Sequence, residues 1–383
     1  MGLPYYQMLE MYPKNEVVAF SSNYRLYGDM SERVMLTVKS EVPRLLQYSI
    51  DEAFIDLRNF FSSDFKIWGE KLAAKVYKWT GIPVSIGIAP TKTLAKISAK
   101  YAKKYPGYKK CCLIGNELQR VKALENFDIE DVWGIGRRIA RSLHSAGVRS
   151  AYDFTLMPRQ WIKARYHVPG ERTWLELRGI NAVPEDEMGA KQKQSIMTSR
   201  SFPAMLTDID DIRTHIANFA AKCALKLRRQ NSLCRHVMVF LQSNFFREDL
   251  PQYNGSDSYV FLTPTNSTQE IVNIAVNLLS SVFKTGIHYK RGGVMVSEIV
   301  SAKAFQPDLF EFDITRNRKL NSISKTLDKI NGIMGDDTLR LACQLYTSYD
   351  PRVGKPVKFT HAIKRALLSP DYSTSYDAFT VYI

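Results

Sequence analysis

The sequence predicts an α+β protein built from several domains, and three observations support this prediction. Its 383 residues are enough for two or three domains. Hydrophobic residues make up 45% of the chain, which allows buried cores. Strand and helix patterns alternate over residues 45–104 and again over 195–300, and the polar stretch 184–194 separates the two regions.

The chain is basic, with 53 Lys and Arg against 38 Asp and Glu and a formal net charge of +15. This balance favours a polyanionic partner, most simply nucleic acid. The five cysteines form no Cys-x-x-Cys pair and no His lies at zinc spacing, so we expect buried or free thiols in a reducing cytosol. No apolar run approaches membrane-spanning length and the N-terminus shows no signal-peptide pattern, so we expect a cytoplasmic protein without a membrane partner.

Two adjacent acids, Asp51 and Glu52, lie between the apolar runs 45–50 and 53–57. Neighbouring side chains on a regular strand point to opposite faces, so the two acids serve one site only where the chain turns. The runs therefore predict a tight hairpin with the acids at its tip. Paired carboxylates on a rigid element suit Mg²⁺. A bare acid pair is more often an ordinary solvated turn, because acids are mostly exposed, so the pair by itself does not establish a metal site.

Helices are predicted on both sides of the hairpin. The first spans Met30 to Arg44 and ends at Pro43, and the second spans Phe65 to Trp79 with its tryptophans in the core. A β-branched strand over 84–89 leads into a helix over 92–104. That helix places apolar residues on one face and a stripe of lysines on the other, namely Lys92, Lys96, Lys100, Lys103 and Lys104. A lysine stripe is usually a solvated face, but it also suits triphosphate oxygens.

A glycine-containing turn follows in the segment 131–148. Gly134 and Gly136 permit a tight turn, and amides at the start of the next helix can hold a DNA phosphate. Arg137 and Arg138 add charge there without reading base sequence. The pattern predicts a helix–hairpin–helix. A Gly-x-Gly is weak evidence by itself, and no strand leads directly into it, which argues against a dinucleotide site.

The C-terminal half predicts a βαββαβ domain, a small sheet with two helices on one face. We expect strands at 195–202, 236–242, 258–262 and 293–300, and helices at 208–230 and 268–285. Arg200 and Arg291 lie near strand ends, where backbone phosphates could bind. Gln306, Asp308, Leu309 and Phe310 follow in the pattern Gln-x-x-Leu-Phe. A further helix is predicted near 317–334.

Several of these stretches resemble Y-family DNA polymerases, the translesion enzymes. Ser-Ile-Asp-Glu-Ala-Phe at 49–54 resembles the family's second metal-binding motif, and residues 84–100 resemble the strand and helix that follow it. Residues 1–6 and 21–31, and Trp-Gly-Ile-Gly at 133–136, resemble the UmuC-like branch. The resemblance implies the following division: fingers remnant 1–20, truncated polymerase palm 21–113, helical thumb 114–183, linker 184–194, little finger 195–305, and clamp-binding motif with UmuC-type tail 306–383.

The resemblance also implies a reaction, error-prone translesion DNA synthesis in the SOS response to DNA damage. A nucleotide would pass from a dNTP to a primer 3′-hydroxyl, with Asp51 and Glu52 ligating Mg²⁺. Lys103 matches a lysine that contacts the incoming triphosphate, and Lys96 is a second candidate near template or primer phosphates. Implied partners are primer–template DNA, the sliding clamp through residues 306–310, a processed UmuD-like dimer through the tail, and RecA as a further candidate.

The first residues depart from the family pattern. Nothing upstream of Asp51 resembles Asp-x-Asn-x-Phe-Tyr, the strand that bears the first metal-binding Asp, and Asp29 falls in a predicted helix. A two-metal site needs ligands for both ions, so we expect weak or absent polymerase activity from this chain by itself. We also expect an exposed sheet edge and apolar surface. A truncated product would explain this, as would a first part supplied elsewhere. The alternative function is a non-catalytic primer–template and clamp-binding fragment.

Overall fold

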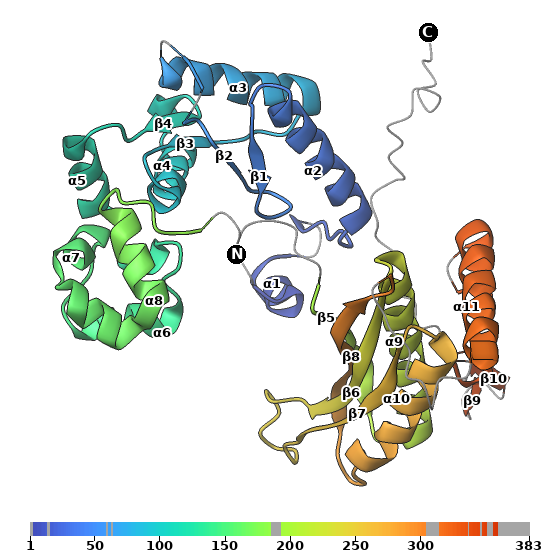
Figure 1. Cartoon of the computed structure of the whole chain (residues 1–383). Helices are drawn as coiled ribbons and strands as arrows, with labels where there is room; N and C mark the ends of the chain where they lie inside the picture. Colours follow the sequence, from blue (N-terminus) through green and yellow to red (C-terminus); the bar gives the residue numbers. More distant parts are fainter. Residues whose placement is uncertain are drawn as a thin grey trace. The chain divides into compact units, whose positions relative to one another are not determined.

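The computed structural model describes residues 3–13, 16–58, 60–62, 64–184, 193–303, 314–335, 337–344, 347–350 and 355–358. It is a mixed α/β structure that divides into two compact units, one containing Met1–Ala190 and the other Lys191–Lys364 (Figure 1). The six-part division expected from the sequence stays a prediction. Within the described residues, no helix is long and apolar enough to cross a membrane.

The first half of unit 1 combines helices with two small sheets. Its elements are α1 (Tyr5–Met11), α2 (Tyr24–Lys39), β1 (Leu45–Gln47), β2 (Ala53–Ile55), α3 (Phe65–Thr80), β3 (Ile86–Ile88), α4 (Lys92–Lys104) and β4 (Cys111–Leu113).

The helix before the hairpin begins earlier than expected. We expected it from Met30, but α2 begins at Tyr24 because the side chain of Asn23 caps it by accepting a hydrogen bond from the Leu26 N–H at 3.3 Å. It ends at Lys39, before Pro43. Apolar spacing alone located the inward face, but the first turn is solvent-exposed and carries no such signal.

The predicted hairpin is confirmed. β1 and β2 pair antiparallel with Gln47 opposite Ala53, and the acids lie in the turn between them. The Tyr48 and Ser49 N–H groups both donate to the Glu52 carbonyl at 3.0 Å, which closes the turn. Among the described strands, β1 and β2 pair only with each other, and so do β3 and β4. Each small sheet therefore keeps open edges, as expected.

Helix α3 matches its prediction closely, but one of its tryptophans does not. Leu72 and Val76 are buried, whereas Trp79 is 60% exposed and carries the Lys75 ammonium 4.2 Å above its ring. The expectation that Trp79 is part of the core was wrong. Helical periodicity indicates which face of α3 is buried, but not how far along the helix other residues cover that face. Strand β3 packs closely on α4: a Cβ on Gly87 would lie 2.0 Å from the Ala95 carbonyl oxygen.

Residues 117–177 of unit 1 contain the helices α5 (Glu117–Glu125), α6 (Arg137–Ser145), α7 (Ala151–Leu156) and α8 (Arg159–Leu177). Leu94 and Ile97 of α4 belong to the same core cluster as Leu143 of α6 and Leu177 of α8. This shared core means that α4, which carries the lysine stripe, and the helical part are packed as one body.

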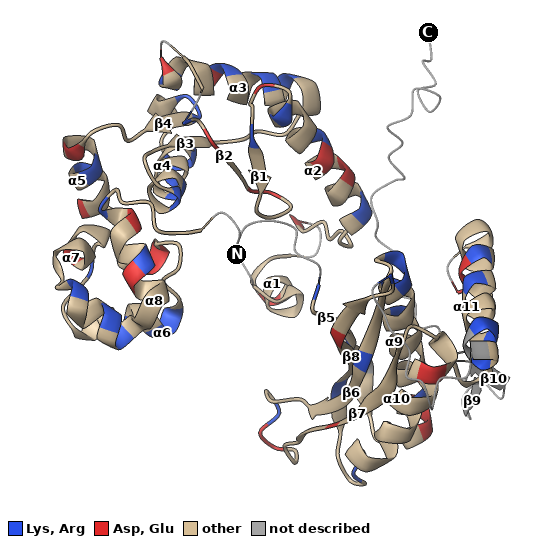
Figure 2. Ribbon diagram, viewed as in Figure 1, with Lys and Arg blue, Asp and Glu red and all other residues tan. Residues whose placement is uncertain are grey.

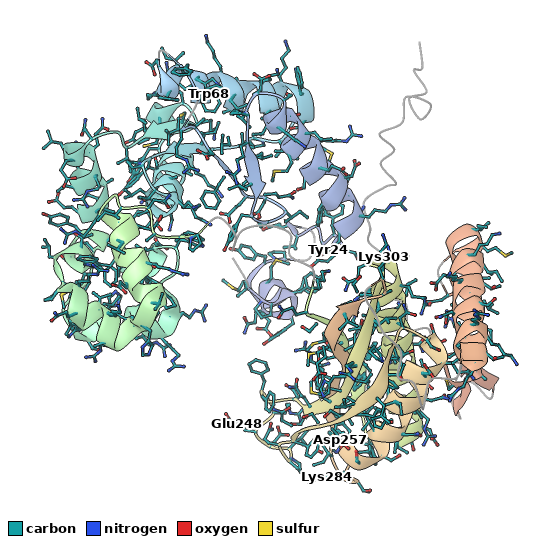
Figure 3. All side chains as sticks on the ribbon, in the orientation of Figure 1. Tyr24, Trp68, Glu248, Asp257, Lys284 and Lys303 are labelled. Carbon is teal, nitrogen blue, oxygen red and sulfur yellow. The ribbon has the colours of Figure 1, made fainter. Side chains whose placement is uncertain are left out.

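Unit 2 has the predicted βαββαβ order. Its elements are β5 (Ser195–Leu206), α9 (Ile209–Arg229), β6 (Ser232–Ser243), β7 (Asn254–Thr265), α10 (Thr268–Val282) and β8 (Tyr289–Ser301). The strands pair antiparallel in the order β5-β8-β6-β7. Side chains of α9 and α10 pack on the sheet around Ile216, Val239 and Val294, and Figure 3 shows this layer filled. The strands run longer than predicted because pairing with the neighbouring strands continues beyond the predicted ends, as in Ser232 opposite Ser301.

Helix α11 (Ile314–Met334) packs beside α10, where Asp328 accepts two hydrogen bonds from Arg228 of α9 at 2.6 and 2.7 Å. The short strands β9 (Thr347–Asp350) and β10 (Lys355–Lys358) form an antiparallel pair. The expected clamp-binding motif at 306–310 and the UmuC-type stretch at 362–370 lie outside the described residues.

Candidate active site

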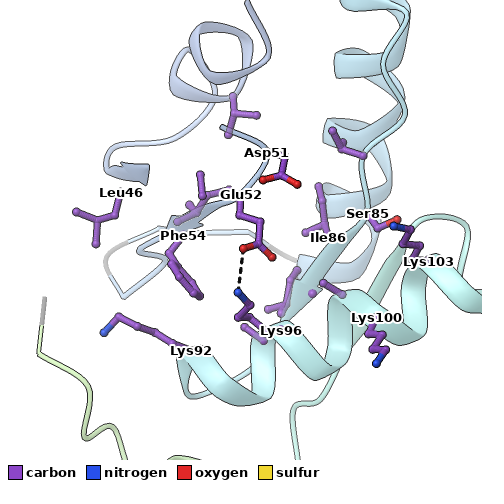
Figure 4. Close-up of a pocket in the computed structure, with 18 of the residues that line it drawn as sticks. Leu46, Asp51, Glu52, Phe54, Ser85, Ile86, Lys92, Lys96, Lys100 and Lys103 are labelled. Carbon is purple, nitrogen blue, oxygen red and sulfur yellow. Dashed lines mark hydrogen bonds and ion pairs between the residues drawn. The ribbon is translucent and has the colours of Figure 1, made fainter. Parts of the chain in front are cut away.

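Unit 1 contains a cleft of about 1820 Å³. Its walls come from α2, the β1–β2 hairpin, β3, α4 and the segment 127–133. Apolar side chains such as Leu46, Ile55 and Ile86 form most of its surface. Its charged lining includes Asp51, Glu52 and the four lysines 92, 96, 100 and 103 (Figure 4). The cleft therefore brings the predicted acids and the predicted lysines to one place.

The two acids are held by the turn that carries them. The Ser49 hydroxyl donates to Asp51 Oδ1 at 2.6 Å, and the Asp51 N–H donates to Ser49 Oγ at 3.2 Å. The Ser31 hydroxyl of α2 donates to the Ile50 carbonyl, which ties the tip to that helix. Both acids are exposed to solvent in the cleft. They are thus fixed in position yet accessible to a ligand.

Lys96 reaches across from α4 to Glu52, and its Nζ lies 3.0 Å from Glu52 Oε2 (Figure 4). Three aromatic rings surround the same ammonium, with ring centroids 4.8 Å (Tyr48), 5.0 Å (Trp133) and 6.0 Å (Phe54) from Nζ. The Trp133 indole N–H also donates to the Tyr48 hydroxyl at 3.3 Å. Lys96 is therefore engaged inside the protein, whereas the sequence suggested a contact to DNA phosphate.

The other lysines of α4 differ from Lys96 and from each other. Lys100 Nζ lies 2.6 Å from Asp131 Oδ2 and 5.1 Å from the centre of the Phe127 ring, so it joins α4 to the segment 127–133. Lys103 is exposed and, in the described part of the chain, has no hydrogen-bond or ion-pair partner. Of the two predicted nucleotide-binding lysines, Lys103 is therefore the one left available to a phosphate.

Asp56, at the end of β2, also lines the cleft, but it is engaged by cations. Hydrogen bonds from the Arg58 side chain and backbone, with the charges of Arg58 and Arg44, lower the pKa of Asp56 to about 2. The Arg58 guanidinium and the Asp56 carboxylate approach to 2.6 Å. Asp56 is thus a structural anion that shapes the hairpin base.

The donor set fits Mg²⁺ bound together with a substrate. Asp51 and Glu52 offer oxygen ligands from adjacent positions, and Mg²⁺ is commonly held by one or two carboxylates plus substrate phosphates. Over the described ranges, no group of three or more Asp, Glu, His or Cys side chains is close enough to form a complete protein cage. The geometry therefore favours a shared site completed by phosphate oxygens.

The predicted phosphate-binding turn leads into α6. Gly134 has φ +92°, which glycine adopts without strain, and Gly136 is the N-cap of α6. Arg137 and Arg138 are exposed in the first turn of that helix, which is rich in basic residues (Figure 2). Amide groups and arginines thus lie at one helix start, as a phosphate contact requires. Recognition of DNA by this turn stays a prediction.

The two predicted arginines of unit 2 lie on neighbouring strands but on opposite faces of the sheet. Arg291 of β8 is opposite Ser201 of β5, and its guanidinium donates to the Ser199 hydroxyl at 2.9 Å. Arg200 falls between those two serines, so its side chain leaves the strand on the other face. Both are exposed, and the structure does not bring them together at one point.

Tyr48, Phe54 and Trp133 are site residues whose role the sequence did not indicate. They form one cluster with ring centroids 5.6 to 5.9 Å apart. Tyr48 and Phe54 are in the hairpin, and Trp133 precedes the Gly134 turn. The available signal was an aromatic residue on either side of the acid pair, since a lysine stripe needs such neighbours to form cation–π contacts.

Comparison with known proteins agrees with this geometry. The impB/mucB/samB family matches residues 1–100, and its C-terminal domain matches residues 193–309. Protein UmuC of Salmonella typhimurium is 36% identical over 377 residues, which cover 98% of this chain and 86% of that protein. Protein SamB of the same organism is 33% identical and covers 98% and 86%. DNA polymerase IV 1 of Mesorhizobium japonicum is 25% identical and covers 87% and 73%.

Among solved structures, a Y-family DNA polymerase chimera superposes with a TM-score of 0.62 at 21% sequence identity. The match covers 78% of this chain and 83% of the chimera, and it supports the fold. The sequence matches extend over nearly the whole chain. The matched residues include the Asp51–Glu52 hairpin and the α4 lysines. The chain belongs to the impB/mucB/samB family, the UmuC-like branch of the Y-family DNA polymerases.

Proposed function

We propose that this polymerase carries out error-prone translesion synthesis in the SOS response, transferring a nucleotide from a dNTP to a primer 3′-hydroxyl with release of pyrophosphate. The observation that carries the proposal is the hairpin tip, which presents Asp51 and Glu52 to a cleft walled on the other side by the α4 lysines. Oxygen ligands opposite cations suit a triphosphate and its cation. Family membership supplies the reaction.

Each residue has a distinct task in this proposal. Asp51 and Glu52 would hold Mg²⁺, which supplies neutralisation of the triphosphate and orientation of the primer hydroxyl. Lys103 would bind the triphosphate, since it is exposed on the cleft wall. Lys96 remains a second candidate for a phosphate contact once it is released from Glu52. The apolar lining from Leu46 to Ile86 would limit water near the reacting atoms.

The DNA backbone would be bound by residues outside the cleft. The Gly134 turn with Arg137 and Arg138 would contact backbone phosphates, and Arg200 and Arg291 would provide further contacts in unit 2. These contacts carry charge without base readout, which suits an enzyme that copies any sequence. The expected partners beyond DNA and dNTP are the sliding clamp through Gln306, Asp308, Leu309 and Phe310, a processed UmuD-like dimer, and RecA.

Primer extension with Mg²⁺ on a primed template tests the proposal. Asp51→Asn and Glu52→Gln should each reduce extension about 100-fold, because each removes a charged ligand worth several kcal/mol in the transition state. Asp29→Asn is the matched control, because Asp29 pairs with Arg33 on α2 and is not part of the cleft lining. Extension that is unchanged in both site variants would contradict the proposal.

A salt titration of DNA binding, combined with primer extension, distinguishes the polymerase from the alternative function, a non-catalytic DNA-binding fragment. A parent chain that binds primer–template with steep salt dependence but extends no primer would instead support the non-catalytic DNA-binding fragment. None of the comparisons supports that alternative, since the relatives share nearly the whole chain and include proteins named as DNA polymerases.

A further inference from the structure

We infer that Lys96 is the built-in counter-ion of Glu52, held by three aromatic rings so that its ammonium occupies the carboxylate until a divalent cation displaces it. The inference rests on the proposed function, which makes Glu52 a metal ligand. It assigns to Lys96 a positioning role that precedes any contact with phosphate.

The first support is the fixation of the ammonium. Lys96 Nζ has ring centroids at 4.8, 5.0 and 6.0 Å, within or at the range of cation–π attraction. The rings contact one another edge-on or tilted, so they form a preassembled cage. The side chain of Lys96 is only 22% exposed. The Lys96 side chain has therefore lost most of its conformational freedom, and its ammonium contacts Glu52.

The second support is the position of the acids. Asp51 and Glu52 are adjacent in a tight turn, and both line the cleft. Two neighbouring carboxylates repel each other, and a nearby cation offsets that repulsion. The contact of 3.0 Å from Lys96 to Glu52 offsets one of them. Asp51, in contrast, is bonded to the Ser49 hydroxyl and keeps its charge available.

The third support is the origin of the cage. Tyr48 and Phe54 belong to the hairpin, Lys96 to α4, and Trp133 to the segment before the Gly134 turn. The cage therefore forms only where these three parts are packed together, and the Trp133 N–H bond to the Tyr48 hydroxyl closes it. Glu52 is thereby oriented by parts of unit 1 that are far apart in sequence.

If Lys96 competes with the metal, removing its charge should raise the affinity for the cation. Structural damage to the hairpin should lower that affinity. Lys96→Met keeps the apolar stem against the rings and removes the charge. It should therefore bind cation more tightly, by about 3-fold to 10-fold, because a nearby positive charge is gone. A variant that merely loosened the hairpin would bind cation more weakly. Lys96→Arg keeps the charge and should bind as the parent does.

The experiment is a titration of the free full-length chain with Mn²⁺, read by electron paramagnetic resonance without DNA or nucleotide. Lys75→Met is the matched control, because Lys75 also pairs with a glutamate, Glu41, and also lies over an aromatic ring, Trp79, but is outside the cleft lining. Its affinity should change by less than 2-fold. Affinity in Lys96→Met that is unchanged or weaker, while circular dichroism reports a folded chain, would overturn the inference.

Glu52→Gln separates this inference from the proposed function. Loss of Mn²⁺ binding in Glu52→Gln with no gain in Lys96→Met would leave Glu52 as a ligand and remove only the counter-ion role. Mn²⁺ binding that is the same in Glu52→Gln and the parent would remove the metal-ligand assignment itself. Primer extension by Lys96→Met at limiting Mg²⁺ gives a second readout, since half-maximal rate should then be reached at a lower Mg²⁺ concentration.

Discussion

The carboxylate of Glu176, at the end of α8, accepts a hydrogen bond at 3.0 Å from the backbone N–H of Thr93 in the first turn of α4. The same carboxylate accepts from the Ala182 and Val183 N–H groups at 2.8 and 3.2 Å, and its residue is fully buried. A negative charge at this helix start also suits the helix dipole. Glu176 thereby fixes the start of α4, the helix with Lys96 and Lys103, to the C-terminal end of α8.

Glu176→Ala should therefore lower the free energy of unfolding by at least about 3 kcal/mol, because three backbone donors lose their buried acceptor and each costs about 1 kcal/mol or more. Urea denaturation followed by circular dichroism measures the loss. Glu125→Ala, at an exposed position of α5, is the control and should stay within about 0.5 kcal/mol of the parent. Equal effects of the two substitutions would show that Glu176 does not fix α4.

The left-handed turn at Gly134 gives a second prediction. Gly134→Ala should lower the free energy of unfolding by about 1 to 2 kcal/mol from backbone strain. A further cost comes from a Cβ only 2.8 Å from Thr173 Oγ1. Gly136→Ala is the matched substitution two residues along. It has φ −86° and open space around its Cβ, so its cost should be about 0.5 kcal/mol, from the weaker N-cap.

Thermal unfolding of the two alanine variants, followed side by side, compares these costs. A Gly136→Ala variant that is less stable than Gly134→Ala would contradict the assigned turn conformation.

The features of the site that depend on neighbouring residues in sequence were predictable, whereas contacts between residues far apart in sequence were not. The hairpin and its acids were predictable because the apolar runs and the turn are local, and α4 because its apolar spacing is regular. The contact between Lys96 and Glu52 was not, because the two residues are 44 positions apart and meet only through the packing of α4 on the hairpin. The contact between Trp133 and the Lys96 ammonium could not be predicted for the same reason.

Fold boundaries followed the same rule. The prediction located α3 and α4 to within about one residue, since both combine a clear apolar face with side-chain caps, from Asp64 and Thr91. It placed the start of α2 too late and the ends of β6 and β7 too far inward. The first turn of α2 carries little apolar signal, and at the strand ends pairing with the neighbouring strand rather than local sequence decides where the strand stops.

Salt dependence should reveal the phosphate contacts of α6. Arg137→Ser combined with Arg138→Ser should make the slope of log K against log salt shallower by about 2, since each phosphate contact contributes about 0.9 on duplex DNA. Lys71→Ser with Lys78→Ser removes the same charge from the exposed face of α3, outside the cleft lining, and should leave the slope near the parent value. Fluorescence anisotropy of a labelled primer–template measures both. Equal slopes in the two double variants would remove α6 from the DNA interface.

The depressed pKa of Asp56 predicts how stability depends on acid. The pKa falls from an ordinary 3.8 to about 2 because Arg58 donates hydrogen bonds to the carboxylate. The folded state therefore binds this proton less readily than the unfolded state. The stabilisation is fully present above about pH 4 and is lost as the pH falls through about 2.

Asp56→Asn should remove that contribution. The parent should exceed the variant in free energy of unfolding at pH 5, and the difference should shrink steadily as the pH falls from 4 toward 2. Asp29→Asn, which breaks a half-exposed i,i+4 pair with Arg33, is the control and should change stability by at most about 0.5 kcal/mol at pH 5. Urea denaturation between pH 2.5 and 5 follows both variants. A difference between parent and Asp56→Asn that stays constant across this range would show that the contact between Arg58 and Asp56 does not stabilise the hairpin base through the carboxylate charge.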